Sequence, residues 1–220
     1  LKAIVADIVG RSDLDINRSV YESERKTGDR NRALAYFMKS TGVIDADVDV
    51  EETLDFYFKA CSLEVDCVDL ARIGLFFAMR GKCLRHSPDG AGGSGGAGDG
   101  GIGDGGAGDG GAGDGGIGDD GAGDGAAAGG CMAEELVSPD IARIVTTIMI
   151  TSGMYNRSGE FFLKVGLPAK SGVSGGIVAF VPGKCGFGGY GPAIDDAGNS
   201  VAGVRLLEEL SLRYGLHLVG

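Results

Sequence analysis

The sequence lacks several features that define other classes of protein. Its five cysteines form no Cys-x-x-Cys pair, so the spacings of zinc knuckles and thioredoxin-type redox sites are missing. No apolar run is long enough to cross a bilayer, and the first residues lack the charged, apolar and small-residue pattern of a signal peptide. We therefore expect a cytoplasmic protein with reduced thiols and no membrane partner.

Basic residues are too few to form a nucleic-acid surface. Lys and Arg number 20 against 31 Asp and Glu, and the formal net charge is −11. Seven of the aspartates and 22 of the 43 glycines lie in residues 91–130, a window without a basic residue. The rest of the chain therefore carries −4 (−11 minus −7), and this mild acidity argues against nucleic acid as a partner.

The glycine-rich window contains a strict repeat. Residues 96–125 are six consecutive five-residue units: GAGDG, GIGDG, GAGDG, GAGDG, GIGDD and GAGDG. Such a sequence buries too little apolar surface to offset the entropy of ordering it. Calcium-binding Gly–Asp coils have a nine-residue period, which this repeat does not match. We therefore predict that residues 91–130 are a disordered low-complexity insertion.

The remaining pattern predicts helices, then antiparallel strands, then a closing helix, which together indicate an α+β domain. Residues 1–86 have helical spacing, including a helix over Cys67–Met79. Residues 160–192 have a strand-like pattern. The residues expected to cap helices are Asp49, Asp66, Ser138 and Ser200 at the start and Gly81 and Gly215 at the end. The side chains expected to face inward are Val50, Leu54, Tyr57, Phe58 and Cys61, then Ile141, Ile144, Val145, Ile148 and Met149, and finally Val204, Leu207, Leu210 and Tyr214.

Three stretches are too particular in composition to be explained by core packing. They are SERKTGDRNR (23–32), SGMY followed by SGEF (152–155 and 158–161), and VGLPAKSGVSGGI (165–177). With LDFYF (54–58) and GNSV (198–201), in this order, they closely resemble the serine-dependent glutaminases. The resemblance implies an incomplete β-lactamase/penicillin-binding-protein-like fold, with a helical subdomain and an antiparallel sheet packed by the C-terminal helix. It also implies one partial glutaminase domain over residues 1–220, interrupted by the insertion.

The resemblance implies an activity as well as a fold. Glutaminases hydrolyse the side-chain amide of L-glutamine to L-glutamate and ammonia, through attack by a serine and an acyl-enzyme. It implies L-glutamine as the small-molecule partner, a homo-oligomer, and neither a metal nor an organic cofactor.

Two residues of the first stretch, Glu24 and Asn31, match substrate-contacting positions of the family. Glutamine brings an α-ammonium and an α-carboxylate, and a carboxylate near the first and an amide near the second are suitable partners. Seven residues make two helical turns, so both side chains would face one pocket if the stretch is helical. Gly28 between them makes an irregular loop equally acceptable.

Four further residues match functional positions of the family. Tyr57 matches a substrate contact, although its place in an apolar stripe leaves a core role open. Tyr155 matches a tyrosine that passes a proton near the nucleophile. Lys170, in a Lys-Ser-Gly strand, would set the local electrostatics, and Val173 would donate its backbone N–H to an oxyanion.

The nucleophile motif of the family, serine and lysine separated by two residues, has no suitable match. The Ser-x-x-Lys at Ser23 to Lys26 lies inside the substrate motif between charged neighbours, so we do not expect Ser23 to be the nucleophile. We expect the nucleophile segment upstream of these residues. This chain alone would then be inactive, and unstable or self-associated through uncovered apolar faces and a sheet edge.

Two alternatives to an active glutaminase stay open. The chain could be a catalytically inactive, glutaminase-like protein that binds glutamate or glutamine, or one that only assembles with an intact homologue. A β-lactamase or peptidase of the same fold is disfavoured, because it gives no reason for the SERKTGDRNR stretch.

Overall fold

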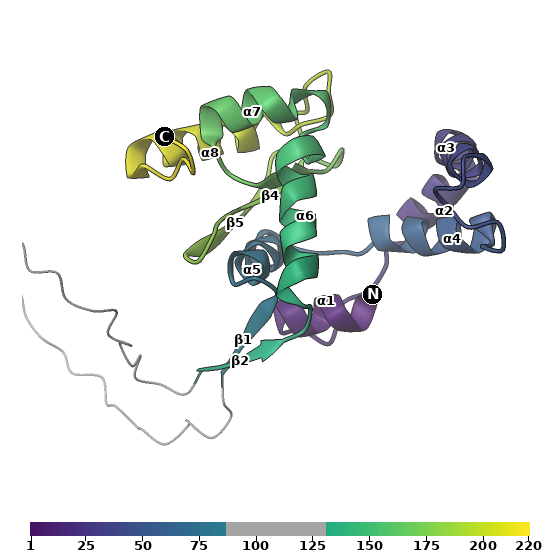
Figure 1. Ribbon diagram of the computed structural model, residues 1–220, viewed down its shortest axis with the longest axis horizontal. Coiled ribbons are helices and arrows are strands. Elements are labelled where there is room, and N and C mark those ends of the chain that lie inside the picture. The colour runs from purple at the N-terminus through teal and green to yellow at the C-terminus, as the bar shows by residue number, and fades with distance from the viewer. Residues whose placement is uncertain (87–130) are drawn as a thin grey trace, which may run out of the picture. The chain divides into compact units, whose positions relative to one another are not determined.

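The structure is a computed structural model that describes residues 1–86 and 131–220 (Figure 1). The predicted insertion, residues 91–130, lies outside the described residues. Residues 1–84 and 133–220 form one compact unit, and residues 85–132 are a second unit of which only the ends are described. The helices are α1 (Lys2–Val9), α2 (Arg18–Thr27), α3 (Asp29–Ser40), α4 (Val50–Cys61), α5 (Cys67–Ala78), α6 (Pro139–Ser152), α7 (Ser158–Val165) and α8 (Val201–Tyr214); the strands are β1 (Lys82–His86), β2 (Cys131–Glu135), β3 (Ala169–Ser171), β4 (Gly176–Val181) and β5 (Cys185–Tyr190). Helices with small antiparallel strands confirm the α+β class.

The helices begin where the capping residues predict. Asp66 caps α5 in a reciprocal box: its Oδ1 accepts from the N–H of Asp69 at 2.8 Å, and Asp69 Oδ2 accepts from the N–H of Asp66 at 3.2 Å. Ser138 accepts from Ile141 N–H at the start of α6. Ser200 accepts from Gly203 N–H at the start of α8. These caps satisfy N–H groups that have no partner within the helix, which explains why the helices start there.

The main sheet has three antiparallel strands in the order β3-β4-β5. Its register pairs Ala169 with Ala179 and Val178 with Gly188. One face packs closely on α5, because Gly186 and Gly188 leave no room for a Cβ next to the α5 backbone. The other face carries α7 and α8 (Figure 1). The core on that face consists of Met154, Phe161, Val165, Leu167, Ala169, Ile177, Ala179, Val181 and Leu207.

The helices α2, α3 and α4 form a smaller core of their own. It consists of Ala35, Val50, Leu54 and Phe58, and Phe58 is only 1% exposed. Tyr21 and Ile44 pack against it. Burying Val50, Leu54 and Phe58 on one stripe of α4 leaves the opposite stripe free to carry polar groups.

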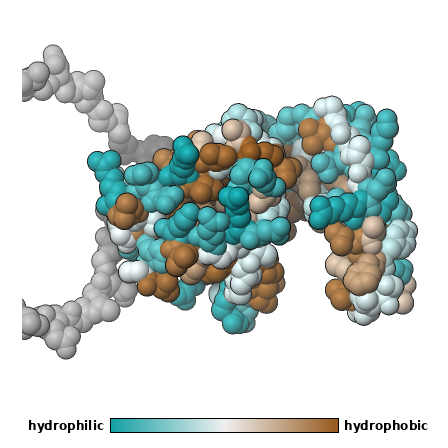
Figure 2. Space-filling model, turned by 90° about the horizontal axis from the view of Figure 1, so that it is seen from above, coloured by the Kyte–Doolittle hydropathy of each residue, from teal (hydrophilic) through white to brown (hydrophobic). Residues whose placement is uncertain are grey.

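Several predicted inward faces are wrong. In α6, Ala142 and Met149 are buried, whereas Ile141, Ile144 and Ile148 are 53%, 55% and 55% exposed. The stripe of isoleucines lies one residue before the buried stripe of Ala142 and Met149, which is a rotation of about 100° around the helix. Both stripes have helical spacing, so periodicity in the sequence could not show which of them is buried. Figure 2 shows hydrophobic side chains on the surface among hydrophilic ones.

The other errors have similar causes. Tyr57 and Cys61 are exposed on α4, and Tyr214 is 64% exposed on α8 because Gly203, Leu207 and Ser211 face the core. The strand-like pattern expected from residue 160 is the helix α7 as far as Val165. In the stretch expected to be helical, residues 82–86 form β1, whose partner β2 lies beyond the insertion.

Among the described residues, no helix is long and apolar enough to span a membrane.

Candidate functional site

The SERKTGDRNR stretch folds as two helices that meet at Gly28, so it is neither one continuous helix nor an irregular loop. Gly28 ends α2 and precedes α3, and a Cβ there would lie 2.5 Å from Phe58 Cζ and 2.8 Å from the backbone oxygen of Glu24. Glu24 and Asn31 therefore sit on either side of the break, each half-buried. Among the described residues, neither side chain has a hydrogen-bonding partner, so both are free to bind a ligand.

Tyr57 lies on the outer stripe of α4 and is 48% exposed, so the core role that the sequence left open is excluded. Hydrogen bonding to Cys61 one turn later is the largest of the effects that raise the pKa of Tyr57 to about 12; partial burial and the charges of Cys61, Glu24 and Tyr155 add to it. The phenol is therefore protonated at neutral pH and acts as a hydrogen-bond donor. Sequence reasoning missed Cys61, although its i, i+4 spacing from Tyr57 was the available signal.

Tyr155 and Lys170 form the tightest contact among the predicted residues. The Lys170 Nζ lies 4.6 Å from the centroid of the Tyr155 ring, a cation–π distance. Tyr155 has a positive φ of 52°, in a turn fixed by Ser158 Oγ, which accepts from Met154 N–H at 3.0 Å and donates to the Tyr155 carbonyl at 2.8 Å. A positive φ in a bulky residue is uncommon and persists only when its surroundings enforce it.

Burial shifts the pKa of both Tyr155 and Lys170. It raises the pKa of Tyr155, with a contribution from the charge of Cys61 in the same direction. Burial lowers the pKa of Lys170, and the charge of Cys61 opposes that shift. The phenol is thus held protonated, while the ammonium gives up its proton more readily than a free lysine does.

The spacing of Tyr155 and Lys170 is set by the contact of α6 with β3. The N–H of Ser171 donates to the carbonyl of Gly153 at 3.1 Å. A Cβ on Gly153 would overlap the carbonyl oxygens of Ala169 and Met149, so only glycine allows this approach. Tyr155 follows Gly153 by two residues, and Lys170 precedes Ser171, so this backbone contact fixes both.

Val173 lies in the turn after β3 and is 66% exposed. In the described part of the chain no group accepts a hydrogen bond from its backbone N–H. Val173 Cγ1 and Tyr155 Cε2 both lie 3.4 Å from the position that a Cβ on Gly198 would take. The loop of Gly198 is held by Asn199, whose Nδ2 donates to the Met154 carbonyl at 3.2 Å. The Val173 side chain and the Tyr155 ring therefore lie beside the same loop, at Gly198.

The structure thus brings together Tyr155, Lys170 and Val173, and the charges of Glu24 and Cys61 act on Tyr57 nearby. Asn31 forms no hydrogen bond with these residues in the part of the chain that the structure describes, and its connection to Glu24 is that α3, which carries it, follows α2 directly at Gly28. Ser23 is exposed on α2. Neither the Tyr155 phenol nor the Lys170 ammonium bonds a serine hydroxyl of the described residues. The arrangement places a phenol, held protonated, against an ammonium group, a pair that can exchange a proton and stabilise negative charge.

Comparison with known proteins gives a consistent result. A model of the family described as Glutaminase matches residues 1–89 and 125–219. The chain is 44% identical over 204 residues to a glutaminase of Alkaliphilus oremlandii, covering 93% of this chain and 51% of the relative. It is 42% identical over 218 residues to a glutaminase of Geobacillus thermodenitrificans, covering 99% of this chain and 55% of the relative. The chain therefore spans about half the length of the curated relatives it matches.

Solved structures show the same likeness. A Bacillus subtilis glutaminase was solved as a covalent complex with 5-oxo-L-norleucine, formed by reaction with 6-diazo-5-oxo-L-norleucine. It resembles this chain with a TM-score of 0.70 and 33% identity, over 99% of this chain and 60% of that one. A Bacillus glutaminase structure gives a TM-score of 0.70 and 33% identity over 99% of this chain and 58% of that one.

Proposed function

The chain belongs to the glutaminase family, and from this we propose that it supplies part of a site that hydrolyses L-glutamine to L-glutamate and ammonia. The observation that carries the proposal is the placement of Lys170 over the Tyr155 ring, with Val173 beside the same ring at Gly198. The serine nucleophile would come from a part of the protein outside these 220 residues. The covalent complex of the Bacillus subtilis relative supports chemistry by a protein nucleophile.

In the proposed reaction three groups of this chain would take part. When serine Oγ attacks the amide carbon, negative charge develops on the carbonyl oxygen, and the Val173 N–H would stabilise it. The C–N bond then breaks, and the protonated Tyr155 phenol would donate the proton that releases ammonia. On attack the serine gives its own proton to a base carried with the nucleophile. When water then hydrolyses the acyl-enzyme, the water proton returns to Tyr155 and the base returns its proton to serine Oγ. Lys170, with its lowered pKa, would stabilise the phenolate by its charge and assist the return of the proton.

Substrate recognition would use Glu24, Asn31 and Tyr57, of which Glu24 and Asn31 have no hydrogen-bonding partner among the described residues. The Glu24 carboxylate suits the α-ammonium of glutamine. The Asn31 amide and the Tyr57 hydroxyl suit its α-carboxylate, and the raised pKa of Tyr57 keeps that hydroxyl a donor. Because Gly28 joins the helices that carry Glu24 and Asn31, the two contacts depend on one tight junction.

Kinetics of a protein restored to full length test the proposal, with the unmatched part supplied by a curated relative. Replacing Glu24 with Gln removes one charge at constant shape and should raise KM for glutamine about 10- to 100-fold, the value of a hydrogen bond to a charged group. Glu22→Gln on the exposed side of the same helix is the control and should leave KM unchanged. Tyr155→Phe should lower kcat about 100-fold or more. Normal kinetics in both Glu24→Gln and Tyr155→Phe would contradict these roles.

A second function, binding of glutamate without turnover, is favoured by the absence of a serine contact in the described site. Calorimetric titration with L-glutamate tests it, because a binder releases or absorbs heat and Glu24→Gln abolishes that signal. A purely structural chain gives no heat in either form.

Localisation and assembly are also proposals. Free thiols at Cys61, Cys67 and Cys185 favour the cytoplasm. The exposed isoleucine stripe of α6 favours a homo-oligomer, which sedimentation of the restored protein would test.

A further inference from the structure

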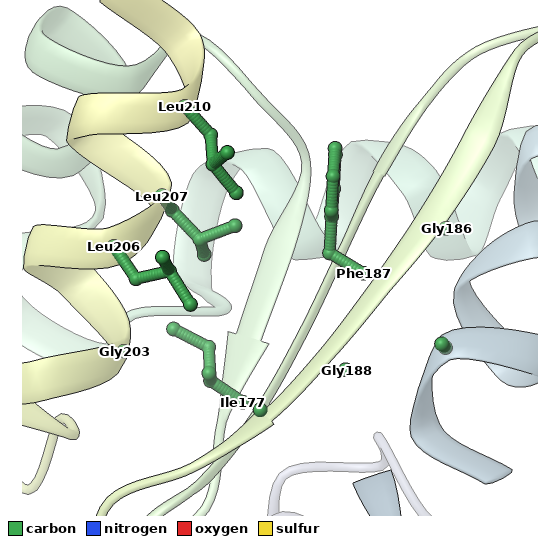
Figure 3. A pocket seen from close by; sticks show the side chains of 10 residues that line it. Ile177, Gly186, Phe187, Gly188, Gly203, Leu206, Leu207 and Leu210 are labelled. Atoms are coloured by element: carbon green, nitrogen blue, oxygen red, sulfur yellow. The ribbon is translucent and has the colours of Figure 1, made fainter. Parts of the chain in front are cut away.

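A hollow of about 230 Å³ lies between β5 and α8, and it offers the charged groups of glutamine no partner. Figure 3 shows Leu207 and Leu210 of α8 pointing across this hollow toward Phe187. None of the side chains that line it is charged or carries a hydrogen-bonding group. The hollow therefore does not suit the α-ammonium and α-carboxylate, whose expected partners lie on α2, α3 and α4.

These expected partners come from three separate helices. Glu24 lies on α2, Asn31 on α3 and Tyr57 on α4 (Figure 1), and we call them the recognition residues. A ligand that contacts all three needs the helices in one fixed arrangement, because a small misplacement of a binding group weakens the contact strongly. Groups that are held in place before binding also lose less entropy when the ligand binds.

Arg32 reaches from α3 to both other helices, in each case beside a recognition residue. On its own helix it directly follows the recognition residue. Its Nη2 donates to the carbonyl of Arg25, which follows the recognition residue of α2, at 2.7 Å. Its guanidinium carbon lies 5.7 Å from the ring centroid of Phe58, which follows the recognition residue of α4, and this is a cation–π distance. One side chain thus contacts all three segments next to the positions that would bind glutamine.

The other nitrogens of Arg32 face acidic side chains. Nε lies 3.5 Å from Glu51 Oε2 on α4, and Nη1 lies 3.7 Å from Asp29 Oδ1 at the start of α3. The side chain is only 26% exposed. The planar guanidinium presents its donors in a fixed fork, so it can hold three directions at once, which a lysine ammonium does less well. The carbonyl of Arg25 lies in the last turn of α2, where carbonyls lack a partner within the helix, and Arg32 supplies that partner.

We propose that Arg32 is a positioning residue for substrate recognition, which holds Glu24, Asn31 and Tyr57 in the arrangement that binds the α-ammonium and α-carboxylate of L-glutamine. The inference rests on the proposed function of those three residues. The contacts of Arg32 described above all lie within α2, α3 and α4. Its loss should therefore weaken substrate binding and leave the chemical step unchanged, which raises KM at constant kcat.

Two variants in the protein restored to full length test this role. Arg32→Met removes the guanidinium and keeps an unbranched side chain that favours a helix. It should raise KM for glutamine about tenfold and change kcat by less than about twofold. Arg32→Lys keeps the charge without the fork and should raise KM only about threefold, a partial recovery. The lysine variant also decides the question if the methionine variant does not fold.

Lys39→Met is the matched control on the same helix. Lys39 Nζ donates to the carbonyl of Val48 at 2.7 Å, so its loss also removes a contact between a cation and a backbone oxygen. Eight residues separate Lys39 from Asn31, about 12 Å along the helix axis. Lys39→Met should lower the melting temperature as much as Arg32→Met does, but it should leave KM unchanged.

The outcomes separate positioning from general stability. A lower melting temperature with unchanged KM in both Arg32 variants would overturn the proposal and leave Arg32 a structural brace. An equal rise in KM for Lys39→Met and Arg32→Met would also overturn it, because general loosening would then explain both. Glu24→Gln is measured beside them. If it raises KM while the Arg32 variants do not, only the positioning role fails; if it leaves KM unchanged, the proposed function fails and the positioning role fails with it.

Discussion

Replacing Gly153 with alanine is the perturbation that most directly probes how the site is held together. The added Cβ would overlap two backbone carbonyl oxygens, those of Ala169 and Met149, which cannot rotate away as a side chain does. The end of α6 must then separate from β3, and the Ser171 hydrogen bond to the Gly153 carbonyl must stretch or break. Overpacking of this kind costs about 3 kcal/mol in free energy of unfolding, the upper part of the usual range.

Gly159, six residues later, is the matched control. Its Cβ position has nothing within 4 Å, and it lies in the helix α7. Gly159→Ala should therefore stabilise the protein by about 0.5 kcal/mol through the unfolded state. Urea unfolding is followed by circular dichroism, since the chain has no tryptophan. With a slope of about 2 kcal/mol/M, Gly153→Ala should lower the midpoint by about 1.5 M and Gly159→Ala should raise it slightly. Equal midpoints for the two variants would refute this account of the α6–β3 contact.

Three further predictions concern the rest of the fold. Asp69→Ala removes a buried carboxylate that takes part in the α5 capping box and accepts a hydrogen bond from Arg11 Nη1 at 2.6 Å. It should lower the free energy of unfolding by about 2 kcal/mol. Asp66→Ser keeps a side-chain cap and should lower the free energy of unfolding by less. The N–H groups of Asn199 and then Ala197 hold the pKa of Asp195 below its usual 3.8, so the stabilisation that it gives is complete above about pH 4 and is lost as pH falls further. Asp195→Asn should therefore flatten the fall in urea midpoint below about pH 4, and an unchanged slope would count against it. The chain alone should sediment above its monomer mass of 22.3 kDa, because the α6 isoleucines and the β5 edge are uncovered, and a sharp monomer would contradict this.

Local signals were readable from the sequence. The caps at Asp66, Ser138 and Ser200 are where the pattern predicts them, because a cap is decided by a few neighbouring residues. The resemblance to the family also placed Tyr155 and Lys170 in one candidate site, and the structure puts the Lys170 Nζ 4.6 Å from the centroid of the Tyr155 ring. What each of these residues does there stays a prediction.

Features decided by distant partners were not readable. The strand β1 pairs with β2 across the insertion, so no local pattern could reveal it. The helix α7 has a strand-like composition, yet Phe161 and Val165, four residues apart, are both buried, and packing outweighs propensity. Cys61 was assigned to a core stripe because apolar spacing cannot tell which of two neighbouring stripes is covered.

Ammonia release from L-glutamine tests the central claim most directly. It is measured for this chain as given and for a matched protein that carries the remaining part of a curated relative. The account predicts release only from the restored protein, because the residues described here would supply a proton donor, a cation and an oxyanion N–H, and the nucleophile would come from the added part. Release from the bare chain would contradict it and would return attention to Ser23.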